Sequence, residues 1–403
     1  MHRRQRAVRP DSNRPGWLCG SLAHLIIALG LLTAVARSAA ADEPKGVSRA
    51  PSPFDRLDSA GLPMSERAFF LDRTFPAGLV WAYRSGNRIA SSVVISPDGR
   101  WLASATTGDA PIESAERVPP VFLWDTANLG KEPRRLSGHA RGVWALAFSP
   151  DSRTLAGGCM DRTVRLWSLQ DLDARSEAPL PAGTTLEVSR GWVLSVAFSP
   201  DGKTLAATGG LGDGQVWLWN VERNPPTLQA KLKGGGYLIH TVAFSPDGRL
   251  LAATDQARAG AGRSAVRLWQ LGDGSPRALP SLETRSEGHI GAVAFSPAGD
   301  QLAMSAAASS GESEGRLWHV EAGEAKELPI PEGLKLGRGA LAYAPHGGWF
   351  AAAGTLTVRN EERGVEQTWP EVEASSIAFA PDGEHVAVTC RGAVYVLRIG
   401  DGK

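Results

Sequence analysis

The sequence has few cysteines and lacks the short motifs that carry common site chemistry. It contains three cysteines, of which Cys19 lies near the N-terminus, so Cys159 and Cys390 are the thiols of the remaining chain. It contains no H-E-x-x-H, C-x-x-C or Asn-x-Ser/Thr sequence. This absence excludes a zinc-protease helix, a paired-cysteine metal or redox motif and an N-glycosylation acceptor. We therefore expect no metal and no cofactor. Because Cys159 and Cys390 fall in the second and seventh of the repeats described below, we also expect two free, mostly buried thiols.

The sequence also lacks a strong net charge. Forty-three basic and 42 acidic residues give a formal charge of +1 at pH 7. Residues 1–41 hold six arginines and one aspartate, which leaves 37 basic and 41 acidic residues, a net of −4, in the remainder. A mildly acidic body lacks the electrostatic footprint of nucleic-acid binding, so we expect no nucleic-acid partner.

Residues 1–41 have the pattern of a secretory signal peptide. Five arginines between positions 3 and 14 precede an apolar stretch at 22–35 and three alanines at 39–41. This order predicts cleavage before Asp42, export to the periplasm or the extracellular space, and no membrane insertion after cleavage. The alternative is an uncleaved membrane anchor, because residues 17–36 are about long enough to span a bilayer. His24 and the Ala-x-Ala end favour cleavage.

A five-residue segment recurs seven times along the rest of the chain. Its clearest copy is Phe-Ser-Pro-Asp-Gly at 198–202, and its proline recurs at positions 97, 150, 200, 246, 297, 345 and 381. Apolar, β-branched runs on both sides of a Pro-Asp-Gly turn predict a β-hairpin, because proline presets the first turn angle and glycine accepts a positive φ. A period near 50 residues is typical of propeller blades.

The second copy has the most specific pattern. Leu-Ala-Gly-Gly-Cys-Met-Asp-Arg-Thr-Val-Arg-Leu-Trp at 155–167 follows Leu-Ser-Gly-His at 136–139, and together they resemble a repeat of the WD-repeat β-propeller family. The resemblance extends over residues 76–399 and implies an all-β, seven-bladed propeller of four-stranded antiparallel blades. Residues 42–75 form a linker and lead-in segment, and residues 400–403 a short tail.

The ends of the repeat region raise the question of how the ring closes. The last repeat ends near 393–397, where its third strand is expected, so its fourth strand must come from elsewhere. The usual offset before the first turn falls on Leu-Val-Trp-Ala-Tyr at 79–83. We therefore predict that this N-terminal strand completes the last blade and removes the exposed edges of an open sheet.

The resemblance also assigns structural roles to several side chains. It implies that His139, Asp161 and Trp167 form a buried hydrogen-bonded chain, in which Gly157 replaces the usual Ser or Thr. A catalytic triad is the less favoured interpretation, because no nucleophile occupies the family position. Five tryptophans that close the third strand of their repeats are expected to pack between sheets: Trp124, Trp167, Trp219, Trp269 and Trp318.

The resemblance also implies that a further set of residues lies on the face that carries the loops between second and third strands. The set comprises Arg141, Trp144, Met160, Trp192, Leu238 and His240. Large apolar side chains of this kind are favoured as interface anchors. The alternative is that each packs under its own loop. Loop insertions at 106–120, 255–264 and 306–315 would rise on the same face, where repeat proteins commonly bind.

These observations favour a monomeric, non-catalytic scaffold that binds one or more protein partners on the loop-bearing face. One alternative is a periplasmic propeller enzyme of the quinoprotein or lactone-hydrolysing kind, which would need a cage of carboxylates, whereas the innermost strands offer little beyond Glu373. The other is a propeller associated with envelope transport. The Arg-Leu-Trp endings of the third strands favour the WD-repeat family over it.

Overall fold

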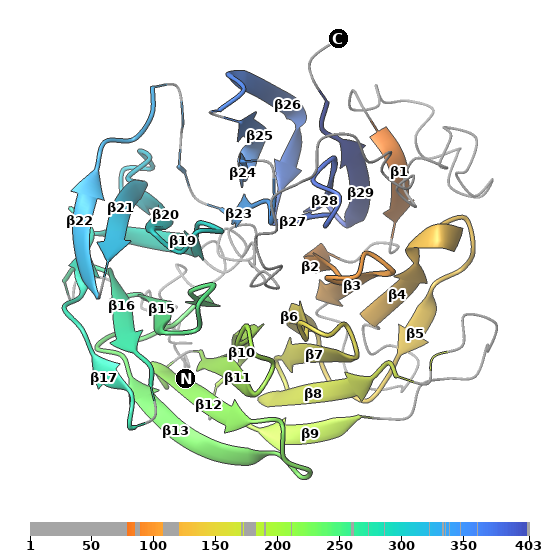
Figure 1. Ribbon diagram of the computed structural model, residues 1–403, viewed down its shortest axis with the longest axis horizontal. Helices are drawn as coiled ribbons and strands as arrows, with labels where there is room; N and C mark the ends of the chain where they lie inside the picture. The colour runs from red at the N-terminus through yellow and green to blue at the C-terminus, as the bar shows by residue number, and fades with distance from the viewer. Residues whose placement is uncertain are drawn as a thin grey trace, which may run out of the picture.

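The computed structural model describes residues 79–400 apart from 85–88, 108–120, 171, 173–182, 189–190, 211, 259–261, 273, 286, 322, 333, 335, 338, 347 and 361. The predicted signal peptide, the 42–75 segment, most of the first loop insertion and the last three residues of the predicted tail lie outside these residues. Within the described part, seven antiparallel sheets are arranged around a common centre (Figure 1), and the helical content is a single 3-10 turn at Thr126–Asn128. The all-β, seven-bladed prediction is confirmed.

Blades are numbered here by the order of their innermost strands, and strands are given from the inside outwards. Blade 1 contains β2 (Ile89–Ile95), β3 (Trp101–Thr107), β4 (Val121–Asp125) and β5 (Arg134–Leu136); blade 2 contains β6 (Val143–Phe148), β7 (Thr154–Cys159), β8 (Thr163–Ser168) and β9 (Thr184–Glu187); blade 3 contains β10 (Val193–Phe198), β11 (Thr204–Gly209), β12 (Gln215–Asn220) and β13 (Thr227–Lys233).

Blades 4 to 7 follow the same order, with one variation. Blade 4 has two short outer strands, β17 (Arg277–Ala278) and β18 (Leu282–Glu283), that both pair with β16 (Ala265–Gln270). Blade 4 contains β14 (Val242–Phe244), β15 (Leu250–Asp255), β16 (Ala265–Gln270), β17 (Arg277–Ala278) and β18 (Leu282–Glu283); blade 5 contains β19 (Gly288–Phe295), β20 (Gln301–Ala308), β21 (Arg316–Glu321) and β22 (Glu324–Leu328); blade 6 contains β23 (Leu341–Tyr343), β24 (Trp349–Ala352), β25 (Gly354–Asn360) and β26 (Val365–Ala374); blade 7 contains β27 (Ser376–Phe379), β28 (His385–Cys390), β29 (Ala393–Arg398) and β1 (Leu79–Arg84).

The N-terminal strand closes the ring, as predicted. β1 pairs antiparallel with β29, with Leu79 opposite Leu397, and the two strands lie side by side in Figure 1. Trp81 also connects blade 7 to blade 1, because its indole N–H donates to the Leu129 carbonyl (3.1 Å) and its ring packs edge-on against Trp124 at a centroid distance of 5.4 Å. The closing strand therefore removes an open sheet edge and adds a contact between the first and last blades.

The recurring turns of blades 1 to 4 share one hydrogen-bonding plan. In blade 3 the Ser199 hydroxyl donates to Asp201 Oδ1 (2.5 Å) and accepts from the Thr204 amide (2.9 Å), while Gly202 has φ +74°. A side chain at Gly202 would disfavour this left-handed backbone conformation. A Cβ there would lie 3.7 Å from Pro150 Cδ in the preceding blade's turn. The turns are therefore also blade-to-blade contacts on the face opposite the loop insertions.

Apolar side chains of neighbouring sheets form the core between blades. Buried alanine, valine and leucine dominate it, and Trp124, Trp167, Trp269 and Trp318 are 1–3% exposed, whereas Trp219 is only partly buried. Hydroxyl groups join the innermost strands, as where Ser195 Oγ accepts from the Val242 amide in the next blade (3.2 Å). Cys159 and Cys390 are buried, as predicted, and no disulfide joins them. Among the described residues no helix is both long and apolar enough to cross a membrane.

Candidate functional site

The antiparallel order of each blade separates its connections onto two faces. The recurring turns lie between first and second strands on one face, so the loops between second and third strands share the other face with the segments that lead from one blade to the next. We call this second side the loop face. Backbone hydrogen bonds tie its two kinds of segment together: the Met160 amide donates to the Gly142 carbonyl (3.0 Å) and the Gly210 amide to the Trp192 carbonyl (2.7 Å).

An apolar group lies on the loop face of blades 2 to 4. Trp144, Leu194 and Leu238 are buried at 3%, 2% and 4% exposure, and the partly buried Met160 and Trp192 pack against them. We call these five residues the aromatic cluster. The rings of Trp144 and Trp192 stack with centroids 6.4 Å apart and an interplanar angle of 17°. Four of the residues expected on this face therefore lie together.

The innermost strands direct the cluster by their register. β6 shifts register against β7 between Val143 and Ala145, so Trp144 lies at a β-bulge, a feature that re-aims a side chain. A similar shift in β10 spans Leu194. Leu194 was not among the residues selected from the sequence. Its place, four residues before the last phenylalanine of its strand, is the place that Trp144 occupies in blade 2.

The other two expected residues lie outside this cluster. Arg141 is exposed, and its backbone carbonyl accepts from the Cys159 thiol. His240 is 1% exposed; its Nε2 lies 3.1 Å from Gln256 Oε1 and its ring centroid 4.7 Å from that of His289 in blade 5. Burial, and then the proximity of His289, hold the pKa of His240 well below its usual range, against the smaller effect of the Gln256 hydrogen bond. His240 is therefore a neutral packing residue at neutral pH.

Tyr237 is an exposed residue of this face that sequence reasoning missed. Its side chain is 38% exposed, and the Arg258 guanidinium carbon lies 5.7 Å from its ring centroid. The backbone holds it between two loops, because its amide donates to the Gln256 carbonyl and its carbonyl accepts from the Gly212 amide, both at 2.8 Å. Tyr237 thus extends the loop face from blade 3 to blade 4.

The expected hydrogen-bonded chain of blade 2 is present in part. His139 places Nδ1 3.0 Å from Asp161 Oδ2 and Nε2 3.1 Å from the Gly157 carbonyl, and the Trp167 indole donates to the Ser137 carbonyl (3.1 Å). Burial opposes ionisation of Asp161, but hydrogen bonds from His139, Thr163 and the Ala140 amide outweigh it and hold the pKa of the carboxyl well below its usual range. These contacts link the loop face to the blade 2 sheet.

The same region contains three potential metal ligands. Ligand atoms of His139, Cys159 and Asp161 lie within 4.8 Å of one another. However, the Cys159 thiol donates to the Arg141 carbonyl (3.2 Å) and accepts from the Asp161 amide (3.3 Å), and both His139 nitrogens face oxygen atoms. Burial and then the Asp161 carboxylate raise the pKa of the thiol far above its usual value. In this structure the three side chains are joined by hydrogen bonds to each other and to the backbone, and so support the loop between β7 and β8.

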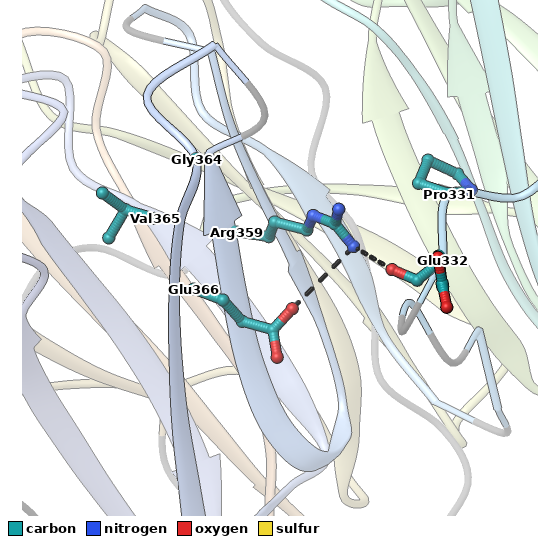
Figure 2. Close-up of a pocket in the computed structure, with 6 residues that line it drawn as sticks. All are labelled: Pro331, Glu332, Arg359, Gly364, Val365 and Glu366. Atoms are coloured by element: carbon teal, nitrogen blue, oxygen red, sulfur yellow. Dashed lines mark hydrogen bonds and ion pairs between the residues drawn. The ribbon is translucent and has the colours of Figure 1, made fainter.

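A cavity of about 400 Å³ lies between the segment after β22 and the β25–β26 hairpin. Figure 2 shows Arg359 pointing between Glu332 and Glu366: its Nη1 donates to the Glu332 carbonyl (2.6 Å) and lies 3.9 Å from Glu366 Oε2. Arg359 pairs with Phe350 of β24. The equivalent pair in blade 5 is Trp318 with Leu302, so Arg359 occupies the position of the third-strand tryptophan. Within this cavity the Arg359 guanidinium thus contacts the Glu332 backbone and faces the Glu366 carboxylate, and its six lining residues include no serine, threonine, cysteine or histidine.

Comparison with known proteins identifies part of the repeat. The family model for the WD domain, G-beta repeat, matches residues 130–168 and 183–220. Each match begins before the outer strand of one blade, β5 or β9, and ends with the third strand of the next, β8 or β12. The chain therefore carries WD40 repeats within a seven-bladed propeller. WD-repeat propellers generally bind protein partners.

Similar curated proteins are WD-repeat proteins that share only a part of their length with this chain. The chain is 35% identical over 126 residues to the Periodic tryptophan protein 2 homolog of Schizosaccharomyces pombe, covering 31% of this chain and 14% of that protein. It is 37% identical over 107 residues to human WD repeat and SOCS box-containing protein 1, covering 26% and 22%. Each match thus spans less than a quarter of the relative.

Among solved structures, the chain is similar to a Kuenenia stuttgartiensis hydrazine synthase chain. The TM-score is 0.62 at 18% sequence identity, covering 79% of this chain and 97% of the other. At this identity the likeness establishes a shared fold alone.

Proposed function

We propose that this chain is a non-catalytic scaffold that binds a protein partner through the loop face of blades 2 to 4. The observation that carries the proposal is the aromatic cluster, in which Trp192 and Met160 are partly exposed above the buried Trp144, Leu194 and Leu238. Tryptophan is enriched among the residues that dominate binding energy at interfaces. The WD40 repeats of the chain support the same role.

The packing of Trp192 favours it as the anchor. Its ring stacks on Trp144, so its rotamer is restricted before any partner binds. Ordering a flexible side chain on association costs about 0.5–1.5 kcal/mol, and a side chain that is already held avoids much of that cost. In this proposal Trp192 and Met160 contact the partner, whereas Trp144 supports them from below.

We also propose that the protein is exported. Support comes from the amino-acid sequence: the basic, apolar and Ala-x-Ala segments of residues 1–41 follow the order of a signal peptide. A partner would then be sought in the periplasm or outside the cell.

Affinity capture from the native cell envelope tests the binding proposal. Wild-type protein and Trp192→Ala would be compared, with Trp217→Ala as the matched control: Trp217 is a partly buried tryptophan in β12 of the same blade, with Lys231 Nζ 3.9 Å from its ring centroid. We expect Trp192→Ala to lose the partner retained by wild type and by Trp217→Ala. Equal retention by all three folded proteins would refute binding through Trp192.

A further inference from the structure

The arginines around the aromatic cluster bear on the chemistry of the partner. Four of them lie on the loop face of blades 2 to 4, and all four are exposed: Arg141, Arg162, Arg258 and Arg263. None has a carboxylate within 4.0 Å in the described part of the chain. They stand out because residues 42–403 carry a net charge of −4.

The carboxylates of the same loops do not neutralise these arginines. Asp161 accepts hydrogen bonds from its own blade, including one from the Ala140 amide at 2.9 Å. Asp255, whose side chain is 2% exposed, accepts from Arg267 Nε and the Gly235 amide, both at 2.7 Å. Asp213 is the third described carboxylate on these loops, and it is partly buried. Two exposed glutamates also lie on this side, Glu187 at the end of β9 and Glu283 at the end of β18. The four exposed arginines outnumber them, so the exposed charge on the loop face of blades 2 to 4 is net positive around an apolar centre.

The loop face becomes negative in the adjoining blade. Glu287 and Glu312 are exposed and Glu314 is partly buried on the corresponding segments of blade 5, where Arg285 is engaged by Glu327 at 2.6 Å. An acidic partner would thus be attracted over blades 2 to 4 and repelled over blade 5. Such juxtaposition favours one orientation of a bound segment.

We infer that the loop face of blades 2 to 4 binds an acidic segment of a partner protein that carries an apolar or aromatic side chain. The apolar side chain packs on Trp192 and Met160, and carboxylates around it face the exposed arginines. This inference rests on the proposed function and specifies the partner. A nucleic acid fits less well, because single strands bind by stacking successive bases on open aromatic faces. Here Trp144 stacks against one face of the Trp192 ring, and Arg258 lies against the Tyr237 ring.

A fluorescence anisotropy titration of the purified full-length chain tests the inference. The probe is a short labelled peptide in which glutamates flank a leucine–phenylalanine pair. Arg141→Glu/Arg258→Glu would be compared with Arg153→Glu/Arg249→Glu, a control of equal charge change at exposed arginines in the turns of the opposite face. We expect the first pair to weaken binding about tenfold and the control pair to leave it unchanged. Binding should also weaken with added salt, because the screening length falls from about 10 Å at 0.1 M to about 3 Å at 1 M.

Three results would overturn the inference: equal binding of a peptide with lysine in place of glutamate, equal loss in both arginine pairs, or tighter binding of a single-stranded oligonucleotide than of the acidic peptide. The capture experiment separates this inference from the proposed function. If native partner capture depends on Trp192 while the acidic peptide fails to bind, the acidic partner is wrong and the scaffold role stands. If Trp192→Ala captures the partner normally, the proposed function fails as well.

Discussion

The stacked pair Trp144 and Trp192 allows stability and binding to be separated by two substitutions. Trp144 is 3% exposed and contacts the buried cluster, so Trp144→Ala should lower the free energy of unfolding by about 3–5 kcal/mol, the usual cost of removing a buried tryptophan. Trp192 is only partly buried, and its loss should remove mainly the ring stacking, about 0.5–1.5 kcal/mol. Urea denaturation of the two variants measures both values.

The effects on partner affinity should have the opposite order. Removal of an interface anchor costs on the order of 2 kcal/mol, which corresponds to about a thirtyfold rise in Kd. We therefore expect Trp192→Ala to lose affinity with little loss of stability. Trp144→Ala, in contrast, should lose stability first, and its affinity should suffer through the released Trp192 ring. Isothermal titration with the captured partner measures the affinities at a temperature where both variants are folded.

A double-mutant cycle decides whether the two rings act as a unit. The coupling free energy in unfolding should be about 0.5–1.5 kcal/mol if the stack observed at 6.4 Å contributes as aromatic pairs usually do. Additive unfolding free energies would show that the rings do not stabilise each other. If Trp192→Ala were as destabilised as Trp144→Ala and still bound the partner normally, Trp192 would be a packing residue and the anchor assignment would be wrong.

Four more predictions concern the remainder of the chain. N-terminal sequencing of native protein should find Asp42 first, and a membrane-bound form retaining residues 1–41 would instead indicate an anchor. Deleting residues 42–66 should leave the melting temperature nearly unchanged, whereas a deletion that includes β1 should cause aggregation visible by light scattering, because it opens a sheet edge. The Asp161 carboxyl has a lowered pKa in the folded state, so its contribution to the free energy of unfolding is complete above its unfolded pKa, about 3.9, and is lost as the pH falls below that value. In urea denaturation at a series of pH values, Asp161→Asn should therefore lose less stability on acidification than wild type. Gly157→Ser should destabilise by about 1–3 kcal/mol in urea denaturation, because a Cβ there would lie 2.7 Å from the Trp167 ring, and a more stable variant would contradict this.

The sequence was sufficient for the fold because the same local signals recur in every blade. Each proline turn lies between two apolar strands, so seven copies define seven hairpins even though the copies at 345 and 381 are weaker. The closure of the ring also followed from an offset, since β1 lies where the regular spacing placed it. Blade 6 departs from the pattern in its core: Arg359 takes the register of the third-strand tryptophan, and Trp369 on the outer strand is buried instead.

The candidate site was less predictable, because exposure on the loop face depends on contacts between loops of different blades. Trp192 and Leu238 both stand six residues before the last phenylalanine of their strands. Both also accept an equivalent backbone hydrogen bond, Leu238 from Gln256 and Trp192 from Gly210, yet Leu238 is 4% exposed whereas Trp192 remains partly exposed. Equivalent positions in the repeat therefore become a buried support in one blade and an accessible anchor in the next. The loop between second and third strands differs in length between these two blades, so a repeat pattern that fixes the strands leaves the binding surface open to variation from blade to blade.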